Sequence, residues 1–287
     1  MQTRIFATIV FLVVFSSPRF SSMQAGVKQG AKELSGPDLT GYRLAFEEEF
    51  TGPLSVSAYG PGTKWIAHTP YGADFGEAWF TDPTFSPSPF SIKNGILNIT
   101  AWKDRTNKNH WRSGLLSSVD RRGAGFAQAL GYYEARMQLP TGPGVWPAFW
   151  LDGLGSFKTP KTKTAEVDIL EEYGVDSRIA HQNVHVWNAD GSQYSGVGNA
   201  SICQGMTTGF HTYAALIKTD YIHFYFDGIE QWKTPTPPEA KEPLYVMVDL
   251  ALGGGWPIDQ TPDPSHLYVD YIRVYAPFAG STASSVH

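Results

Sequence analysis

The stretch "GYYEARMQLP", Gly131–Pro140, alternates apolar and polar side chains with a period of two. Successive side chains of a β-strand point to opposite faces, so this pattern predicts a strand with one buried face. The same pattern recurs in segments separated by Gly, Pro, Asn and Asp: Gly95–Lys103, His211–Asp220, Tyr221–Gly228, Pro243–Leu252 and Leu267–Ala276. No amphipathic helix longer than about two turns competes with them, which favours an antiparallel β-sandwich or barrel.

The chain length of 287 residues fits one large β domain. Its Pro-rich stretches are flanked by strand-like segments, so they read as loops rather than as linkers between domains. We expect a single domain over residues 38–276, after a loose polar segment at 26–37 and before a disordered tail at 277–287.

The N-terminus carries Arg4 and then an apolar run from Ile5 to Phe15. This run is too short to span a bilayer and fits the core of a signal peptide. We expect a signal peptide over residues 1–25, without a clear cleavage site. The mature protein is then secreted or periplasmic, with no membrane partner once the signal is removed.

Charge and cysteine content exclude nucleic-acid binding and an intrachain disulfide. The net charge is −5 and no basic run is present, so nucleic acid is excluded as a partner because its phosphates demand clustered Lys and Arg. The single cysteine, Cys203, excludes an intrachain disulfide and is expected to be a small buried thiol.

The stretch "AEVDILEEYG", Ala165–Gly174, places four carboxylates within seven residues. Its β-branched and apolar residues predict a strand, on which Glu166 and Asp168 share one face. Crowded carboxylates raise one another's pKa, so that one can donate a proton while another stays ionised. Hydrolysis of a glycosidic bond needs this division of roles.

Strict alternation would place Glu172 on the face of Glu166, about 20 Å away at ~3.3 Å per residue. A retaining glycosidase needs its two carboxyl groups about 5–5.5 Å apart. A one-residue β-bulge at Ile169–Leu170 would instead turn Glu171 to that face and leave Glu172 out. The alternatives are a solvated acidic strand or a calcium cluster, although calcium sites favour loops rich in Asp, Asn and Gly.

These residues resemble the E-[ILV]-D-[ILV]-x-E signature of family-16 glycoside hydrolases, in the laminarinase-like branch whose motif carries one extra residue. The resemblance covers Tyr42 to Ala276. Upstream of the acids the family's order places "LGYYEARMQLPTGPGVWPAFWL", and downstream follow "GFHTYAALIKTDYIHFYFDGIEQW", "YVMVDLALGGGWP" and "LYVDYIRVYA".

The resemblance implies an all-β, two-sheet antiparallel jelly-roll sandwich of the concanavalin A-like type, with an open substrate cleft. It implies a retaining double displacement in which Glu166 is the nucleophile, Asp168 tunes it and Glu171 is the acid/base, with no cofactor for catalysis. The expected function is a secreted, monomeric endo-β-glycanase whose partner is a polysaccharide: a β-1,3- or mixed β-1,3/1,4-glucan, or a related bacterial exopolysaccharide. A transglycosylase that uses the same acids, or a non-catalytic glucan-binding lectin, is the alternative.

Aromatic residues near the acids are expected to bind substrate, because an indole can stack on the apolar face of a sugar ring. The candidates are Trp146 and Trp150 in "VWPAFW", His185 and Trp187 in "NVHVWN", and Trp256 in "GGGWP". Core packing is the alternative for each tryptophan, and a satisfied structural histidine is the alternative for His185.

The sequence contains candidate ligands for two metal ions, zinc and calcium. His181 and His185 form an H-x-x-x-H pair, but no third ligand follows and the segment is not helical, so zinc is not expected. The resemblance also implies a structural Ca²⁺ held by Asp270, by the backbone of Gly95 and by the "FEEEF" segment.

Overall fold

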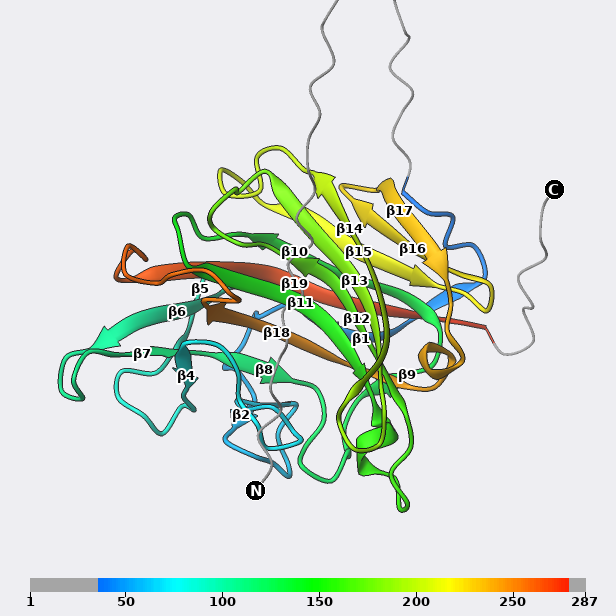
Figure 1. Cartoon of the computed structure of the whole chain (residues 1–287), viewed down its shortest axis with the longest axis horizontal. Helices are drawn as coiled ribbons and strands as arrows, with labels where there is room; N and C mark the ends of the chain where they lie inside the picture. The colour runs from blue at the N-terminus through cyan, green and yellow to red at the C-terminus, as the bar shows by residue number, and fades with distance from the viewer. Residues whose placement is uncertain (1–35, 279–287) are drawn as a thin grey trace, which may run out of the picture.

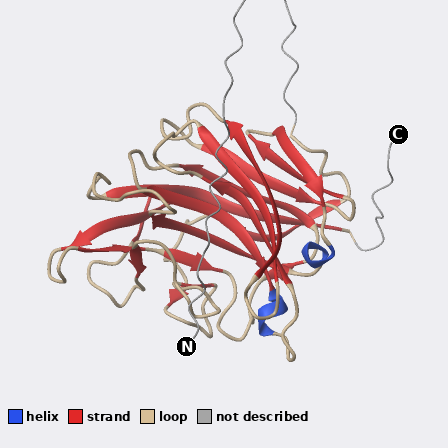
Figure 2. Ribbon diagram, in the orientation of Figure 1, coloured by secondary structure: helices blue, strands red, loops and turns tan. Residues whose placement is uncertain are grey.

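The computed structural model describes residues 36–278 and shows two β-sheets packed face to face (Figures 1 and 2). The signal peptide predicted at 1–25 and most of the predicted tail lie outside the described residues. The last strand runs through Pro277, so it includes the first residue that was assigned to the tail. All six strands that alternation predicts are present.

The first sheet has ten strands. They are β1 (Tyr42–Glu48), β4 (Ala78–Phe80), β5 (Phe90–Lys93), β6 (Ile96–Asp104), β7 (His110–Ser113), β10 (Gly131–Gln138), β15 (His211–Ile217), β16 (Tyr221–Phe226), β17 (Ile229–Pro235) and β19 (Ser265–Pro277). Their order is β17-β16-β15-β10-β19-β6-β7-β4, with β1 paired to β19 and β5 paired to β6.

The second sheet has nine strands and carries the acidic motif. They are β2 (Val56–Ser57), β3 (Trp65–Ile66), β8 (Leu115–Ser117), β9 (Ala127–Gln128), β11 (Val145–Gly153), β12 (Thr164–Glu171), β13 (Ile179–Trp187), β14 (Gln193–Ile202) and β18 (Leu244–Leu252). Their order is β14-β13-β12-β11-β18-β8-β3-β2, with β9 paired to β18. Two short pairs, β2 with β3 and β4 with β7, are parallel, which departs from the fully antiparallel expectation.

Helical structure within residues 36–278 is limited to two short 3-10 turns, η1 (Leu154–Phe157) and η2 (Pro238–Lys241). Among these residues there is no helix with the length and apolar character needed to cross a membrane. The sheets therefore supply nearly all of the framework that positions the site.

The main core lies between the two sheets and takes apolar side chains from both, such as Tyr133 and Val269 from the first and Phe149 and Val248 from the second. Cys203 belongs to this core, and burial raises the pKa of its thiol to about 12. The thiol is therefore protonated and unreactive at neutral pH, as a small buried apolar group would be.

A second apolar cluster covers part of the other face of the nine-stranded sheet. Trp150 and Met247 from neighbouring strands form it together with Phe80. We call this face, which points away from the ten-stranded sheet, the outer face. It carries the acidic motif.

Candidate active site

The bulge predicted in the acidic motif is confirmed by the strand register. Phe149 on β11 pairs with Leu170, but the next residue, Trp150, pairs with Asp168, so Ile169 is the extra residue on β12. The pairing of β12 with β13 shifts at the same place. Ile169 and Leu170 both lie in the core between the sheets, which returns Glu171 to the outer face.

Three rows of side chains cross the outer face from β12 to β14. Because directly paired residues of antiparallel strands share a face, each acid has neighbours at known positions. The rows are Glu166–His185–Gly196, Asp168–Asn183–Gly198 and Glu171–His181–Ala200.

Glu171 is held by three donors. The Nε1–H of Trp146 donates to Oε1 at 2.9 Å, the hydroxyl of Tyr173 donates to the same oxygen at 3.2 Å, and Nδ2–H of Asn183 donates to Oε2 at 2.7 Å. Burial raises the pKa of Glu171, and these hydrogen bonds oppose the rise because they favour the ionised form. A carboxyl group with a raised pKa in a fixed orientation suits proton transfer.

Glu166 and Asp168 differ from Glu171 in their surroundings. Glu166 is partly exposed and accepts a hydrogen bond from the Nε1–H of Trp187 at 3.1 Å. Asp168 is buried, and its pKa is raised well above the usual value, first by burial and then by the charges of Glu171 and Glu166. Nε2 of His185 lies 3.5 Å from Oδ2 of Asp168. The raised pKa favours the protonated form of Asp168, which lies beside the more accessible carboxyl group of Glu166.

Glu172 is separated from these acids, as predicted. Its side chain is fully buried, and neither carboxyl oxygen has a hydrogen-bond partner. Burial raises its pKa to about 8, so it is protonated at neutral pH. It therefore belongs to the interior, and Glu171 is the member of the pair that is available for chemistry.

The predicted aromatic residues lie in different environments. Trp146 and Trp187 are partly buried and bind the acids directly. Trp150 is only 5% exposed, and its Nε1–H donates to buried Asp249 at 2.8 Å, an arrangement that favours a structural role over the predicted stacking on sugar. Trp256 is 45% exposed in the turn after β18. Substrate binding by these residues stays a prediction.

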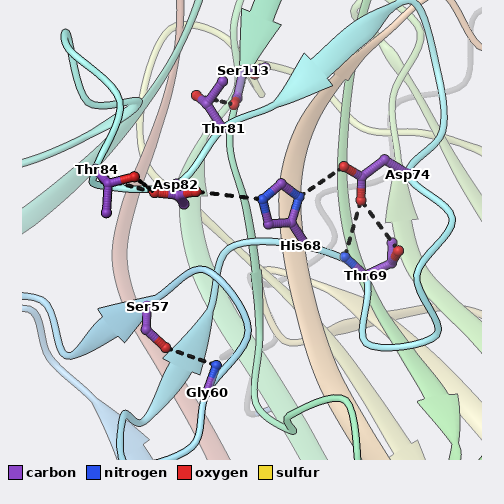
Figure 3. Close-up of polar contacts among 9 residues, drawn as sticks. All are labelled: Ser57, Gly60, His68, Thr69, Asp74, Thr81, Asp82, Thr84 and Ser113. Carbon is purple, nitrogen blue, oxygen red and sulfur yellow. Dashed lines mark hydrogen bonds and ion pairs between the residues drawn. The ribbon is translucent and has the colours of Figure 1, made fainter.

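The segment between β3 and β4 packs over the outer face beside the acids. The ring of Phe75 contacts Trp146 and Trp150 edge-on, at centroid distances of 5.4 Å and 5.7 Å. Figure 3 shows what fixes this segment: His68 lies between two carboxylates, with Nδ1 2.9 Å from Asp74 and Nε2 3.9 Å from Asp82. The segment thus forms a wall next to Trp146.

Metal ligation is the other chemistry that this arrangement allows. Glu166, Asp168 and His185 offer ligand atoms that all lie within 4.8 Å of one another. His181 is not part of this group; it pairs with Glu171, and its ring meets Tyr173 edge-on at 5.0 Å. The predicted H-x-x-x-H histidines therefore belong to different rows.

The residues predicted for structural calcium fit the ion only in part. Gly95 lies in the turn before β6 and approaches the carbonyl oxygen of Glu49, since a Cβ on Gly95 would be 3.9 Å from it. The carboxylate of Asp270, however, forms an ion pair with Arg136. That ion pair engages Oδ2 of Asp270, and calcium binding stays a prediction.

Three polar residues of the site were not predicted from the sequence: Asn183, Tyr173 and Asp249. Asn183 lies two residues before His185 on the same strand, so the alternation that places His185 on the outer face also places Asn183 there. Tyr173 follows the end of β12, where alternation gives no guidance. Burial raises the pKa of Asp249 to about 8, but nothing in its apolar strand marks it in the sequence.

The family model for glycosyl hydrolases family 16 matches residues 80–273, and the chain belongs to that family. Two curated relatives come from Rhizobium meliloti strain 1021: endo-1,3-1,4-beta-glycanase ExsH, 34% identical over 70% of this chain, and endo-1,3-1,4-beta-glycanase EglC, 35% identical over 69%. The matches cover 43% of each relative, so the chain spans less than half of their length.

Solved structures of similar fold support the architecture. A laminarinase catalytic domain from Thermotoga petrophila RKU-1 aligns over 83% of this chain and 98% of its own, with a TM-score of 0.67 and 22% identity. SCLam, a non-specific endo-β-1,3(4)-glucanase crystallised with a glucan oligosaccharide, aligns over 86% of this chain and 98% of its own, with a TM-score of 0.68 and 25% identity. The predicted jelly-roll sandwich and the predicted family are confirmed.

Proposed function

We propose that this chain is a retaining endo-β-glycanase. It hydrolyses internal β-1,3 or mixed β-1,3/1,4 linkages of a glucan or a related bacterial exopolysaccharide. The observation that carries the proposal is the bulge at Ile169, which brings Glu171 onto the face of Glu166 and Asp168. The names of the relatives ExsH and EglC support the same linkage class.

In the first step the Glu166 carboxylate attacks the anomeric carbon while Glu171 gives its proton to the leaving glycosidic oxygen. The raised pKa of Glu171 favours the protonated form that this step needs. Asp168 shares the space between the two and, when protonated, donates to Glu166 instead of repelling it. In the second step Glu171 deprotonates water, which attacks the same carbon and releases Glu166.

The decisive experiment measures reducing ends released from laminarin, lichenan and an acidic exopolysaccharide, and follows the anomer formed first by NMR. We expect release from at least one polymer with retention of configuration. Glu171→Gln should abolish release from these unactivated polymers, whereas the matched variant Glu172→Gln should keep it. Binding without release would instead identify a lectin, and products longer than the substrate under excess acceptor would identify a transglycosylase.

We further propose that the protein is exported, acts as a monomer and needs no cofactor for catalysis. The apolar N-terminal run supports export, and the site's own carboxyl groups supply every proton transfer in the two steps. Fractionation of the source cells and gel filtration of the purified protein test the location and the oligomeric state.

A further inference from the structure

Two glycines occupy the edge strand β14 directly opposite the polar residues of the site. Gly198 pairs with Asn183, and Gly196 pairs with His185. Neither glycine has a positive φ, so the backbone at both positions is one that any residue adopts. Glycine inside a strand weakens it and often marks a close approach by another group.

The approach comes from the neighbouring strand. A Cβ on Gly198 would lie 2.0 Å from Oδ1 of Asn183, and a Cβ on Gly196 would lie 2.9 Å from Nδ1 of His185 and 2.5 Å from Nε2 of Gln193. Both distances to β13 are shorter than real Cβ contacts. The side chains of Asn183 and His185 therefore lie directly over the glycine backbone of β14.

This placement determines which acids the side chains of Asn183 and His185 face. With Oδ1 over Gly198, the amide of Asn183 presents Nδ2–H to Oε2 of Glu171 at 2.7 Å. His185, over Gly196, presents Nε2 toward Asp168 at 3.5 Å. A side chain on either glycine would force its neighbour to rotate.

We propose that Gly198 and Gly196 are positioning residues of the active site, because their missing side chains leave the space in which Asn183 holds Glu171 and His185 faces Asp168. The inference rests on the proposed role of Glu171 as the acid/base. Neither glycine touches the reacting groups; each acts through its partner on β13.

The consequence for Glu171 is measurable as a change in pH dependence. Besides Asn183, the polar groups facing Glu171 are Trp146 on β11, Asp168 on its own strand, Tyr173 just beyond it, His181 on β13 and Asp249 on β18. The hydrogen bond from Asn183 lowers the pKa of Glu171. Losing it should raise that pKa and move the basic limb of the kcat/KM profile to higher pH.

The test is a double-mutant cycle with Gly198→Ala and Asn183→Ala. Charge-assisted hydrogen bonds of this kind correspond to about ten- to hundredfold in an equilibrium or a rate, so we expect Gly198→Ala to lower kcat/KM at pH 7 about tenfold. Its basic limb should move to higher pH while the melting temperature stays level or rises. In the Asn183→Ala background the same glycine change should have almost no further effect.

Val197→Ala is the matched control, since Val197 lies between the two glycines and on the opposite face of β14. It should keep the wild-type profile. Wild-type rates in Gly198→Ala, or equal losses from Gly198→Ala with and without Asn183, would overturn the inference. If Glu171→Gln kept full activity, the proposed function itself would fail, whatever the glycine variants do. A double-mutant cycle with Gly196→Ala and His185→Ala is an independent second test.

Discussion

At the scale of single residues, the carboxyl groups of the site differ in the side chains that donate hydrogen bonds to them. Trp146, Tyr173 and Asn183 donate to Glu171, whereas Trp187 donates to Glu166, although both acids lie on one strand. Donors that favour the ionised form set how far burial can raise each pKa. The environments of the two acids therefore differ because of their neighbours on β11 and β13.

Trp146→Phe tests this at one donor. The variant keeps an aromatic ring beside Phe75 and Tyr173 but removes the N–H that donates to Glu171. Because that hydrogen bond lowers the pKa of Glu171, the basic limb of the kcat/KM profile should move to higher pH. Steady-state kinetics across pH on a soluble glucan measure the shift.

Trp187→Phe is the comparison, since it removes the donor to Glu166. It should lower kcat/KM without moving the basic limb. Equal basic limbs in wild type and Trp146→Phe would count against Glu171 as the proton donor.

Sequence reasoning reached most of these residues but not all. The acids, Trp146, His185 and Trp187 follow from strand alternation and the motif. Asn183 follows from the same alternation but offers no ionisable group to draw attention. Trp150 shows the limit of the pattern: it lies on the outer face as expected, but Phe75 comes from a distant loop and helps to bury it.

At the scale of elements, β12 shows how one inserted residue changes which side chains meet. Ile169 and Leu170 both point into the core, so the alternation resumes with Glu171 outside. If Ile169 were removed, Glu166, Asp168 and Glu171 would alternate strictly along the strand and still share one face. The bulge thus adjusts the approach of Glu171 but is not the only geometry that exposes it.

Deleting Ile169 should therefore leave a folded enzyme with reduced but measurable release of reducing ends. Deleting Val167 instead brings Glu166 and Asp168 next to each other, on opposite faces, and should abolish release. Reducing-end assays together with melting curves distinguish lost chemistry from lost folding. A folded but inactive Ile169 deletion would show that the bulged spacing itself is required.

The strands themselves were predicted unevenly. The six alternating segments match β6, β10, β15, β16, β18 and β19 to within a few residues. Strand β14 was missed because nearly all of it is exposed on both faces, so its sequence carries no apolar period. The short strands β2, β3 and β4 lie in Pro- and Gly-rich sequence, where turn signals outweigh the strand pattern.

At the scale of the whole molecule, buried carboxyl groups link stability to pH. Glu172 and Asp249 are buried, and burial raises the pKa of each to about 8. Between the ordinary pKa of a carboxyl group and 8, the unfolded chain ionises while the folded chain holds its protons. The free energy of unfolding should therefore fall as pH rises through this window.

Glu172→Gln should flatten that decline. Each such group lowers the free energy of unfolding by about 1.4 kcal/mol per pH unit. Between pH 5 and pH 8 the free energy of unfolding of the variant should therefore fall by about 3 kcal/mol less than that of the wild type. Urea denaturation at the two pH values measures the difference. Glu242→Gln, at an exposed ion pair with Lys158, is the control that should follow wild type. Parallel curves for Glu172→Gln and wild type would contradict the burial of an unpaired acid.

The position of β19 has a consequence for how the chain acquires its shape. This strand begins at Ser265, yet it lies between β10 and β6 and also pairs with β1. During synthesis the middle of the ten-stranded sheet must wait for β19, Ser265–Pro277, to emerge. Closing contacts so distant along the chain is slow. The nascent chain would therefore stay open until nearly all of the domain has been made, which is the condition in which a polypeptide can still be threaded through a narrow pore.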